Sequence, residues 1–212
     1  MGGSDCEFLR DGWLAQPANA WSSGAYLVAA VGVLWRPPMG RRSPAVVAGA
    51  LALALTFFGS LAYHGPQPAW AGAAHDASIA ALLLALVAGG LAATIPPHVP
   101  RWPAVAAAAG LVLAAAFLPA LVLGPLAAVL AGVEVQRARL RAGPSPARRV
   151  AVLALGLALV LYGLGRTGGP LCRPASPIQA HAGWHVLTAV AAAAALFHGD
   201  RLDALRRAAG PD

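Results

Sequence analysis

Apolar runs of about twenty residues recur along the whole chain, and most of them begin or end at a proline. A helix needs roughly 20 residues to cross a bilayer core about 30 Å thick. The composition agrees, because 58% of the 212 residues are hydrophobic and 11% are charged, which is too apolar for a soluble domain. We therefore predict an all-α membrane protein and exclude a water-soluble globule.

Seven such crossings fit the length of the chain and leave little for loops. The predicted spans are residues 17–35, 44–64, 76–95, 103–122, 125–140, 147–165 and 179–198. Residues 104–133 could instead form one long helix, but Pro119, Gly124 and Pro125 favour a break there. The prediction is a single seven-helix membrane domain over residues 1–212, with a short extracytoplasmic segment, 1–16, and a short cytoplasmic tail, 199–212.

All fifteen basic residues are arginines, and the seven spans sort them unequally. One side receives Arg36, Arg41, Arg42, Arg101, Arg137, Arg139, Arg141, Arg148, Arg149, Arg201, Arg206 and Arg207, whereas the other keeps Arg10, Arg166 and Arg173. Because positive residues gather in cytoplasmic loops, we expect the N-terminus outside and the C-terminus in the cytoplasm. The net charge of +7 then needs no nucleic-acid partner.

The lack of lysine beside abundant alanine and arginine is typical of GC-rich bacterial genomes. We therefore expect the inner membrane of a bacterium, with the functional site towards its outer face.

Five polar residues fall at the outer ends of predicted spans. Ser60 and His64 are one helical turn apart, Asp76 opens the next span, and His181 and His185 are again one turn apart at the start of the last span. Ionisable side chains at membrane depth are costly and mark functional sites. Residues more than a hundred positions apart are thus predicted to meet at one level.

Three histidines can give three nitrogen ligands to Zn²⁺ and leave a fourth position for water, as in catalytic zinc sites. Asp76 could orient a ligand or move a proton, and Ser60 could stabilise an oxyanion. A structural alternative is that the His181 and His185 pair only makes hydrogen bonds between helices. Because neighbouring residues point about 100° apart on a helix, we interpret His75 as a loop or cap residue.

Cys6 and Cys172 both fall on the outer, oxidising side of the predicted topology. A disulfide and two unrelated small residues both fit this placement.

These residues together resemble the CREST superfamily of seven-span membrane hydrolases and receptors, which includes alkaline ceramidases and adiponectin-receptor-like proteins. The matching pieces are Cys6-Glu7, Asn19, GSLAYH at 59–64, Asp76 and HAGWH at 181–185. The early Cys-Glu and Asn19 point towards the alkaline ceramidase branch. The resemblance implies that His64, His181 and His185 bind zinc, with Ser60 and Asp76 as catalytic residues beside the metal water.

The same resemblance implies a zinc-dependent, ceramidase-like amidohydrolase. Its substrate would be a membrane lipid with an acyl chain, ceramide or a related N-acylated lipid, cleaved to a free amine and a fatty acid. It also implies a disulfide between Cys6 and Cys172. For the calcium site of this family, Asp5, Glu7, Asp11 and Asn19 are the candidate oxygen ligands, whereas Ser4, Leu9 and Gln16 depart from the expected ligands.

Two other functions also fit these residues. One is a seven-span receptor or sensor with a structural zinc and little turnover, which the short tail and the lack of a cytoplasmic domain disfavour. The other is a serine hydrolase that uses Ser60, His64 and Asp76 without metal. That alternative leaves His181 and His185 without a role, and Ser60 does not stand in a G-x-S-x-G motif.

Overall fold

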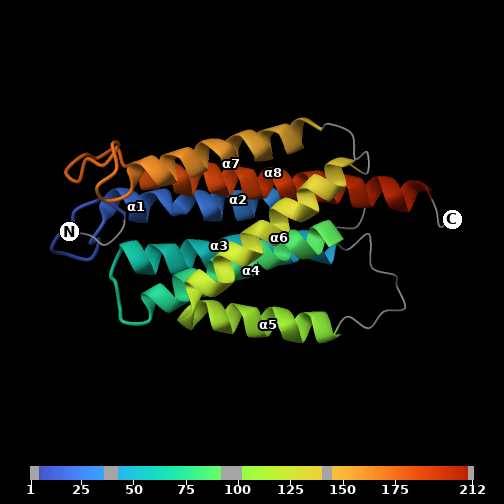
Figure 1. Cartoon of the computed structure of the whole chain (residues 1–212), viewed down its shortest axis with the longest axis horizontal. Helices are drawn as coiled ribbons and strands as arrows, with labels where there is room; N and C mark the ends of the chain where they lie inside the picture. The colour runs from blue at the N-terminus through green and yellow to red at the C-terminus, as the bar shows by residue number, and fades with distance from the viewer. Residues whose placement is uncertain (1–4, 36–42, 92–101, 140–144, 210–212) are drawn as a thin grey trace.

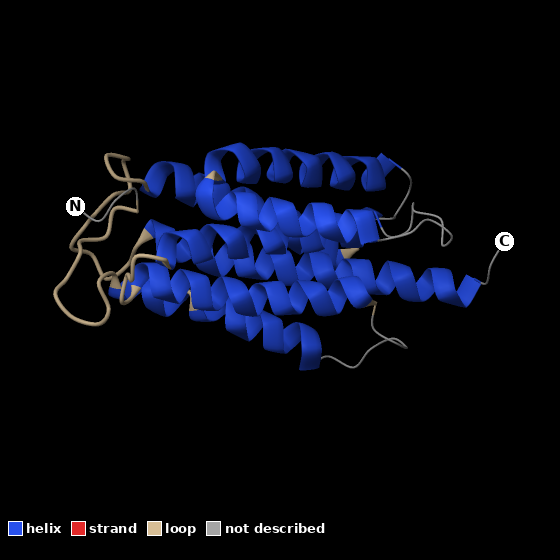
Figure 2. Ribbon diagram, turned by 90° about the horizontal axis from the view of Figure 1, so that it is seen from below, coloured by secondary structure: helices blue, strands red, loops and turns tan. Residues whose placement is uncertain are grey.

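The computed structural model describes residues 5–35, 43–91, 102–139 and 145–209. Within these ranges the chain is a bundle of helices without strands, and the first and the last described residues lie at opposite ends (Figures 1 and 2). The helices are α1 (Pro17–Ser22), α2 (Gly24–Trp35), α3 (Pro44–His64), α4 (Ala71–Leu91), α5 (Trp102–Phe117), α6 (Pro119–Arg139), α7 (Pro146–Gly165) and α8 (Ala180–Ala209).

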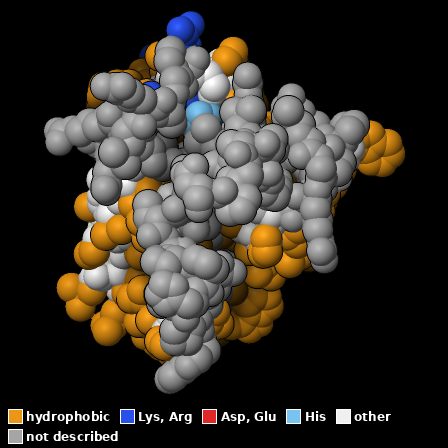
Figure 3. All heavy atoms as spheres, turned by 90° about the vertical axis from the view of Figure 1, so that its right-hand side faces the viewer, with side chains coloured by type: hydrophobic (Ala, Val, Ile, Leu, Met, Phe, Trp, Pro, Cys, Tyr) orange, Lys and Arg blue, Asp and Glu red, His pale blue; other side chains and the backbone are white. Residues whose placement is uncertain are grey.

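Four helices are long and apolar enough to cross a membrane: α3, α4, α7 and the Ala180–Gly199 part of α8. Pro103–Phe117 and Pro119–Val133 form shorter apolar helices. Hydrophobic side chains cover the visible flanks of the bundle among the described residues (Figure 3), as expected for a surface in contact with lipid. An integral membrane protein is therefore indicated, whereas seven crossings and their direction stay predictions.

The ends of α3 and α4 show how local sequence sets a boundary. The α3 helix has the predicted bounds, because Ser43 accepts a hydrogen bond from the Val46 amide and Pro44 occupies the first turn. The α4 helix begins at Ala71 rather than at residue 76. Its first amide donates to the Pro68 carbonyl at 2.8 Å, and the small residues that follow are good helix formers.

Two breaks between helices differ from the prediction. The break between α5 and α6 falls at Leu118, because Pro119 starts α6 where no intrahelical N–H is needed. Pro125 is accommodated inside α6. The first predicted span consists of α1 and α2, which meet at Ser23, where the Ser23 hydroxyl donates to the Asn19 carbonyl at 2.9 Å.

The α3 and α8 helices lie at the centre of the packing. One apolar cluster joins α2, α3, α4 and α8 through residues such as Leu53, Leu82 and Leu196. A second cluster joins α4, α5 and α6 around Ala80 and Ala115. Among the described helices, α7 contacts only α8, and α6 contacts only α4 and α5. No described helix therefore closes the bundle between α6 and α7.

Gly59 permits a close approach of α3 to the start of α4. A Cβ atom there would lie 3.0 Å from both the Ala74 carbonyl oxygen and the His75 Cα. Both neighbours are backbone atoms, which cannot rotate away as a side chain can. The end of α3 is thereby held against the first turns of α4.

Candidate metal centre

Three buried histidines meet at the end of the bundle where the described N-terminal residues lie. His64 is the last residue of α3, whereas His181 and His185 lie in the first turns of α8. The spacing of four residues puts the latter two on one face of α8, and α8 packs against α3. Their exposed fractions are 0%, 8% and 1%.

The three rings are close enough to share one ion. The ring centroid of His64 lies 5.1 Å from that of His181 and 5.1 Å from that of His185, and the last two are 4.6 Å apart. One ligand nitrogen from each residue lies within 4.8 Å of the others. The Nε2 atoms of His64 and His181 are buried and have no hydrogen-bond partner among the described residues. Because orphaned buried nitrogens are costly, this donor set fits a metal ion.

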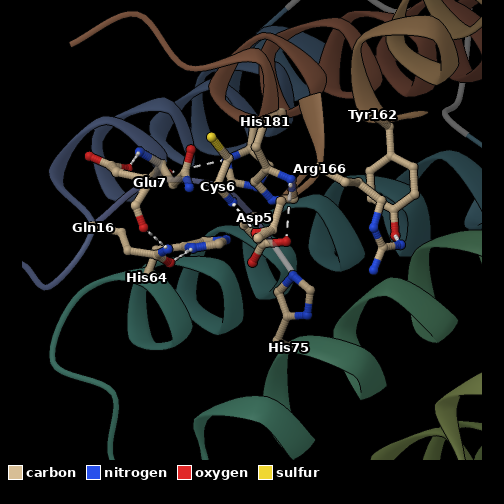
Figure 4. Close-up of polar contacts among 12 residues, drawn as sticks. Asp5, Cys6, Glu7, Gln16, His64, His75, Tyr162, Arg166 and His181 are labelled. Carbon is tan, nitrogen blue, oxygen red and sulfur yellow. Dashed lines mark hydrogen bonds and ion pairs between the residues drawn. The ribbon is translucent and has the colours of Figure 1, made fainter. Parts of the chain in front are cut away.

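The Nδ1 atom of each histidine faces a polar group, as Figure 4 shows for His64 and His181. The His64 Nδ1 lies 2.7 Å from Gln16 Oε1, and the His181 Nδ1 lies 3.7 Å from Asp5 Oδ1. The His185 Nδ1 contacts two groups, the Ser22 Oγ at 2.9 Å and the Asn19 carbonyl oxygen at 3.2 Å.

Ser60 lies one turn before His64 on α3 and is 1% exposed. Its hydroxyl makes a 2.8 Å hydrogen bond with the Ser23 hydroxyl. Ser23 in turn donates to the Asn19 carbonyl. The hydroxyl of Ser60 is thus held near the histidines through the junction of α1 and α2.

Asp76 lies in the second turn of α4 and is bonded to its neighbour in the chain. His75 Nδ1 lies 2.9 Å from Asp76 Oδ1. Among the described residues, His75 is the hydrogen-bond partner of the Asp76 side chain. The His75 ring stacks on Tyr63 and lies 6.1 Å from the His64 ring, centroid to centroid. Our interpretation of His75 as a loop or cap residue is therefore wrong: α4 starts early, and His75 lies within its second turn, beside His64.

The four candidate calcium ligands have separate surroundings. Both carboxylate oxygens of Glu7 accept backbone hydrogen bonds at the start of α1, from Ala18 at 2.8 Å and from Asn19 at 3.0 Å. Asp5 lies beside His181, and Asp11 is exposed. In the part of the chain that the structure describes, no metal-ligand group forms from these carboxylates. A calcium site formed by these residues stays a prediction.

Cys6 and Cys172 are joined by a disulfide with a Cα–Cα distance of 5.5 Å. The bond ties the N-terminal residues to the loop between α7 and α8. Cys6 has a φ of 70°, and its amide also donates to the Thr167 hydroxyl at 3.2 Å.

Sequence patterns did not identify Gln16 and Ser22 as partners of the histidines. Neither residue lies in a motif, and each is more than 40 positions from the histidine that it contacts. The sequence also did not predict an apolar cavity of about 450 Å³ between α3, α4 and α5. None of the three histidines lines it, whereas Gly59 and Ala77, the chain neighbours of Ser60 and Asp76, do.

The arrangement can hold one metal ion through three nitrogens at one end of a membrane bundle. No protein-family model and no curated protein matches the chain.

Proposed function

We propose that the protein is a zinc-dependent membrane hydrolase that cleaves the amide bond of ceramide or a related N-acylated lipid to a free amine and a fatty acid. The observation that carries this proposal is the buried group of His64, His181 and His185. Three imidazoles with a remaining position for water are typical of catalytic rather than structural zinc. The resemblance of the surrounding motifs to those of alkaline ceramidases supports an amide as the bond that is cleaved.

Each polar residue of the site has its own role in the proposed reaction. A bound zinc ion supplies a nucleophilic water at neutral pH and polarises a carbonyl oxygen. His64, His181 and His185 hold the ion. The Ser60 hydroxyl donates to Ser23 in the structure, and in the reaction it would turn to donate to negative charge that develops on the amide oxygen. The His75 and Asp76 pair, hydrogen-bonded at 2.9 Å, relays a proton towards the leaving nitrogen.

The surroundings support a lipid substrate. Large hydrophobic side chains of α7, including Val152 and Leu153, are exposed, and no described helix covers the space between α6 and α7. These exposed apolar side chains place α7 against lipid and support a substrate that lies in the bilayer. From the distribution of arginines, we place the histidine end at the outer face of a bacterial inner membrane.

The test uses the full chain purified in detergent. We expect one zinc per chain by elemental analysis, and release of the amine from a fluorescent long-chain ceramide. His64→Ala should abolish zinc binding and amine release, because only two of the three imidazoles would remain. The matched control is His198→Ala, which removes another buried histidine whose Nδ1 contacts Ser145 at 2.9 Å and which does not belong to the cluster. Zinc content and turnover should survive in this control.

Absence of stoichiometric zinc in the wild-type protein would contradict the proposal. Full activity of His64→Ala would also contradict it. One zinc per chain with ceramide binding but without amine release would support a receptor or sensor in place of a hydrolase.

A further inference from the structure

All three histidines of the proposed metal site are contacted at Nδ1 by one continuous stretch of chain, residues 5–22, which we call the N-terminal clasp. Gln16 contacts His64, Asp5 lies by His181, and both Ser22 and Asn19 contact His185. The histidines themselves come from α3 and α8, far along the chain. One segment therefore reaches every ligand of the site.

The hydrogen bonds decide which nitrogen of His64 carries the proton. The amide of Gln16 is oriented by its Nε2, which donates to the Glu7 carbonyl at 3.1 Å. A carbonyl can only accept, so the Gln16 oxygen is the atom that faces His64. The His64 Nδ1 must then donate. In a neutral imidazole the other nitrogen, Nε2, is left with a lone pair for a metal.

His185 is held in the same tautomer by a different route. The single hydroxyl proton of Ser22 is donated to the Asn19 carbonyl at 2.9 Å. Towards His185 the Ser22 oxygen therefore accepts, as does the Asn19 carbonyl. The Asp5 carboxylate, which carries no donor when ionised, lies on the Nδ1 side of His181. Acceptors thus face all three Nδ1 atoms.

The clasp is fixed at both ends. The disulfide anchors Cys6, next to Asp5, to Cys172. The Glu7 carboxylate caps α1, and the amides of Ala15 and Gln16 donate to the carbonyls of Gly65 and His64 at 3.1 and 2.8 Å. The acceptors are therefore held in place before any metal binds.

We infer that the N-terminal clasp positions the three metal ligands: its hydrogen-bond acceptors fix His64 and His185 in the Nδ1-protonated form and direct their Nε2 atoms to one ion, and the disulfide holds the Asp5 carboxylate beside the Nδ1 of His181. This inference rests on the proposed metal site. Partners of this kind raise the basicity of ligating histidines, and their removal typically costs 10- to 100-fold in metal affinity.

The experiment measures the dissociation constant for Zn²⁺ by competition with a chromophoric chelator, on the full chain in detergent. Gln16→Leu removes the acceptor of His64 at similar volume, and we expect about 10- to 100-fold weaker binding. The matched control is Gln179→Leu, since Gln179 is also buried but donates to loop carbonyls such as that of Ser176. Its zinc affinity should stay within about threefold of wild type, even if its melting temperature falls.

Two further variants address the rest of the clasp. Asp5→Asn keeps the shape of the side chain and removes its charge, and Cys6→Ser with Cys172→Ser removes the anchor beside it. We expect about tenfold weaker zinc binding in each. The absorption spectrum of bound Co²⁺ gives a second readout, because reoriented ligands change the visible bands whereas a lower melting temperature alone does not.

Wild-type affinity and an unchanged Co²⁺ spectrum in Gln16→Leu and Asp5→Asn would overturn the inference while leaving the metal site intact. Equal weakening in Gln179→Leu would overturn it too, because the effect would then be general destabilisation. A wild-type protein that binds neither ion would remove the proposed function, and the inference with it.

Discussion

The two sides of the bundle stabilise their helices in different ways. On the side of α1, α2, α3 and α8, buried polar groups such as Ser23, Thr56 and Ser60 lie among the apolar residues, and hydrogen bonds cross between helices. On the side of α5 and α6, residues 103–133 contain no charged or hydroxyl side chain. Their contacts with α4 are made by small and branched apolar residues.

This difference indicates which part of a membrane bundle can carry a functional site. Lipid tails are as apolar as leucine, so apolar helices gain little by leaving lipid and associate through packing. Buried polar groups, by contrast, cost free energy unless each finds a partner. The polar side is therefore specified by particular atoms, whereas the α5 and α6 side tolerates any side chain that fits.

Metal removal should separate the two sides most strongly. Stripping zinc with a chelator should lower ceramide turnover by at least about a thousandfold and remove about 4 kcal/mol of stability at a metal concentration of 1,000 times the dissociation constant. Hydrogen exchange should speed up in residues 5–22 and at the start of α8, but not in α5. Re-added zinc should restore both. Uniform loss of protection across all helices would break the comparison.

Glycine to alanine substitutions should be the next largest contrast. Gly59→Ala places a methyl group against backbone of α4, and such overpacking costs about 1–3 kcal/mol. Gly110→Ala in α5 meets nothing within 4 Å and should be neutral or stabilise by up to about 1 kcal/mol, because alanine favours helix. Thermal denaturation in detergent measures both. Equal effects of the two substitutions would show that α3 and α4 have room to separate.

Tyr26→Phe should have a smaller effect on the polar side. The Tyr26 hydroxyl lies 2.7 Å from the Thr188 Oγ1, which itself donates to the Trp184 carbonyl. Thr188 keeps that partner after the substitution, so we expect a loss of about 0.5–1.5 kcal/mol. Denaturation measurements with Tyr26→Phe, Thr188→Val and the double variant would isolate the pair. Additive losses would mean that the two hydroxyls do not interact.

Leu113→Ala in α5 should have the smallest effect. This side chain is 66% exposed, and a substitution of an exposed residue usually changes stability by less than about 0.5 kcal/mol. The melting temperature and zinc content should equal those of wild type. A large loss of stability would indicate that another molecule packs on α5.

Much of the fold was predictable because hydropathy and helix ends are local properties. The bounds of α3 follow from Ser43, Pro44 and the apolar run behind them. We predicted the break between α5 and α6 after residue 122, but it lies at Leu118. The prediction came too late in the chain because Pro119, Gly124 and Pro125 all resemble helix breakers in sequence. Which of them ends a helix depends on the packing of α5 and α6 against α4.

The grouping of the three histidines was predictable from the sequence, but their surroundings were not. Helical periodicity indicated that His181 and His185 share a face, and the ends of the predicted spans placed His64 at the same level. The position of His75 was misjudged because it depends on where α4 starts. No periodicity connects Gln16 to a residue 48 positions away.

The order of residues along the chain was sufficient to predict the apolar helices, the unequal distribution of arginines and the gathering of the histidines at one end. These properties depend on hydropathy and helical spacing, which act between residues close in the chain. Tertiary structure alone decided that Asp5, Gln16, Asn19 and Ser22 face the Nδ1 atoms and that Glu7 caps α1. The reason is physical: a hydrogen bond needs two atoms within about 3 Å, and only packing and the disulfide bring atoms from distant segments so close.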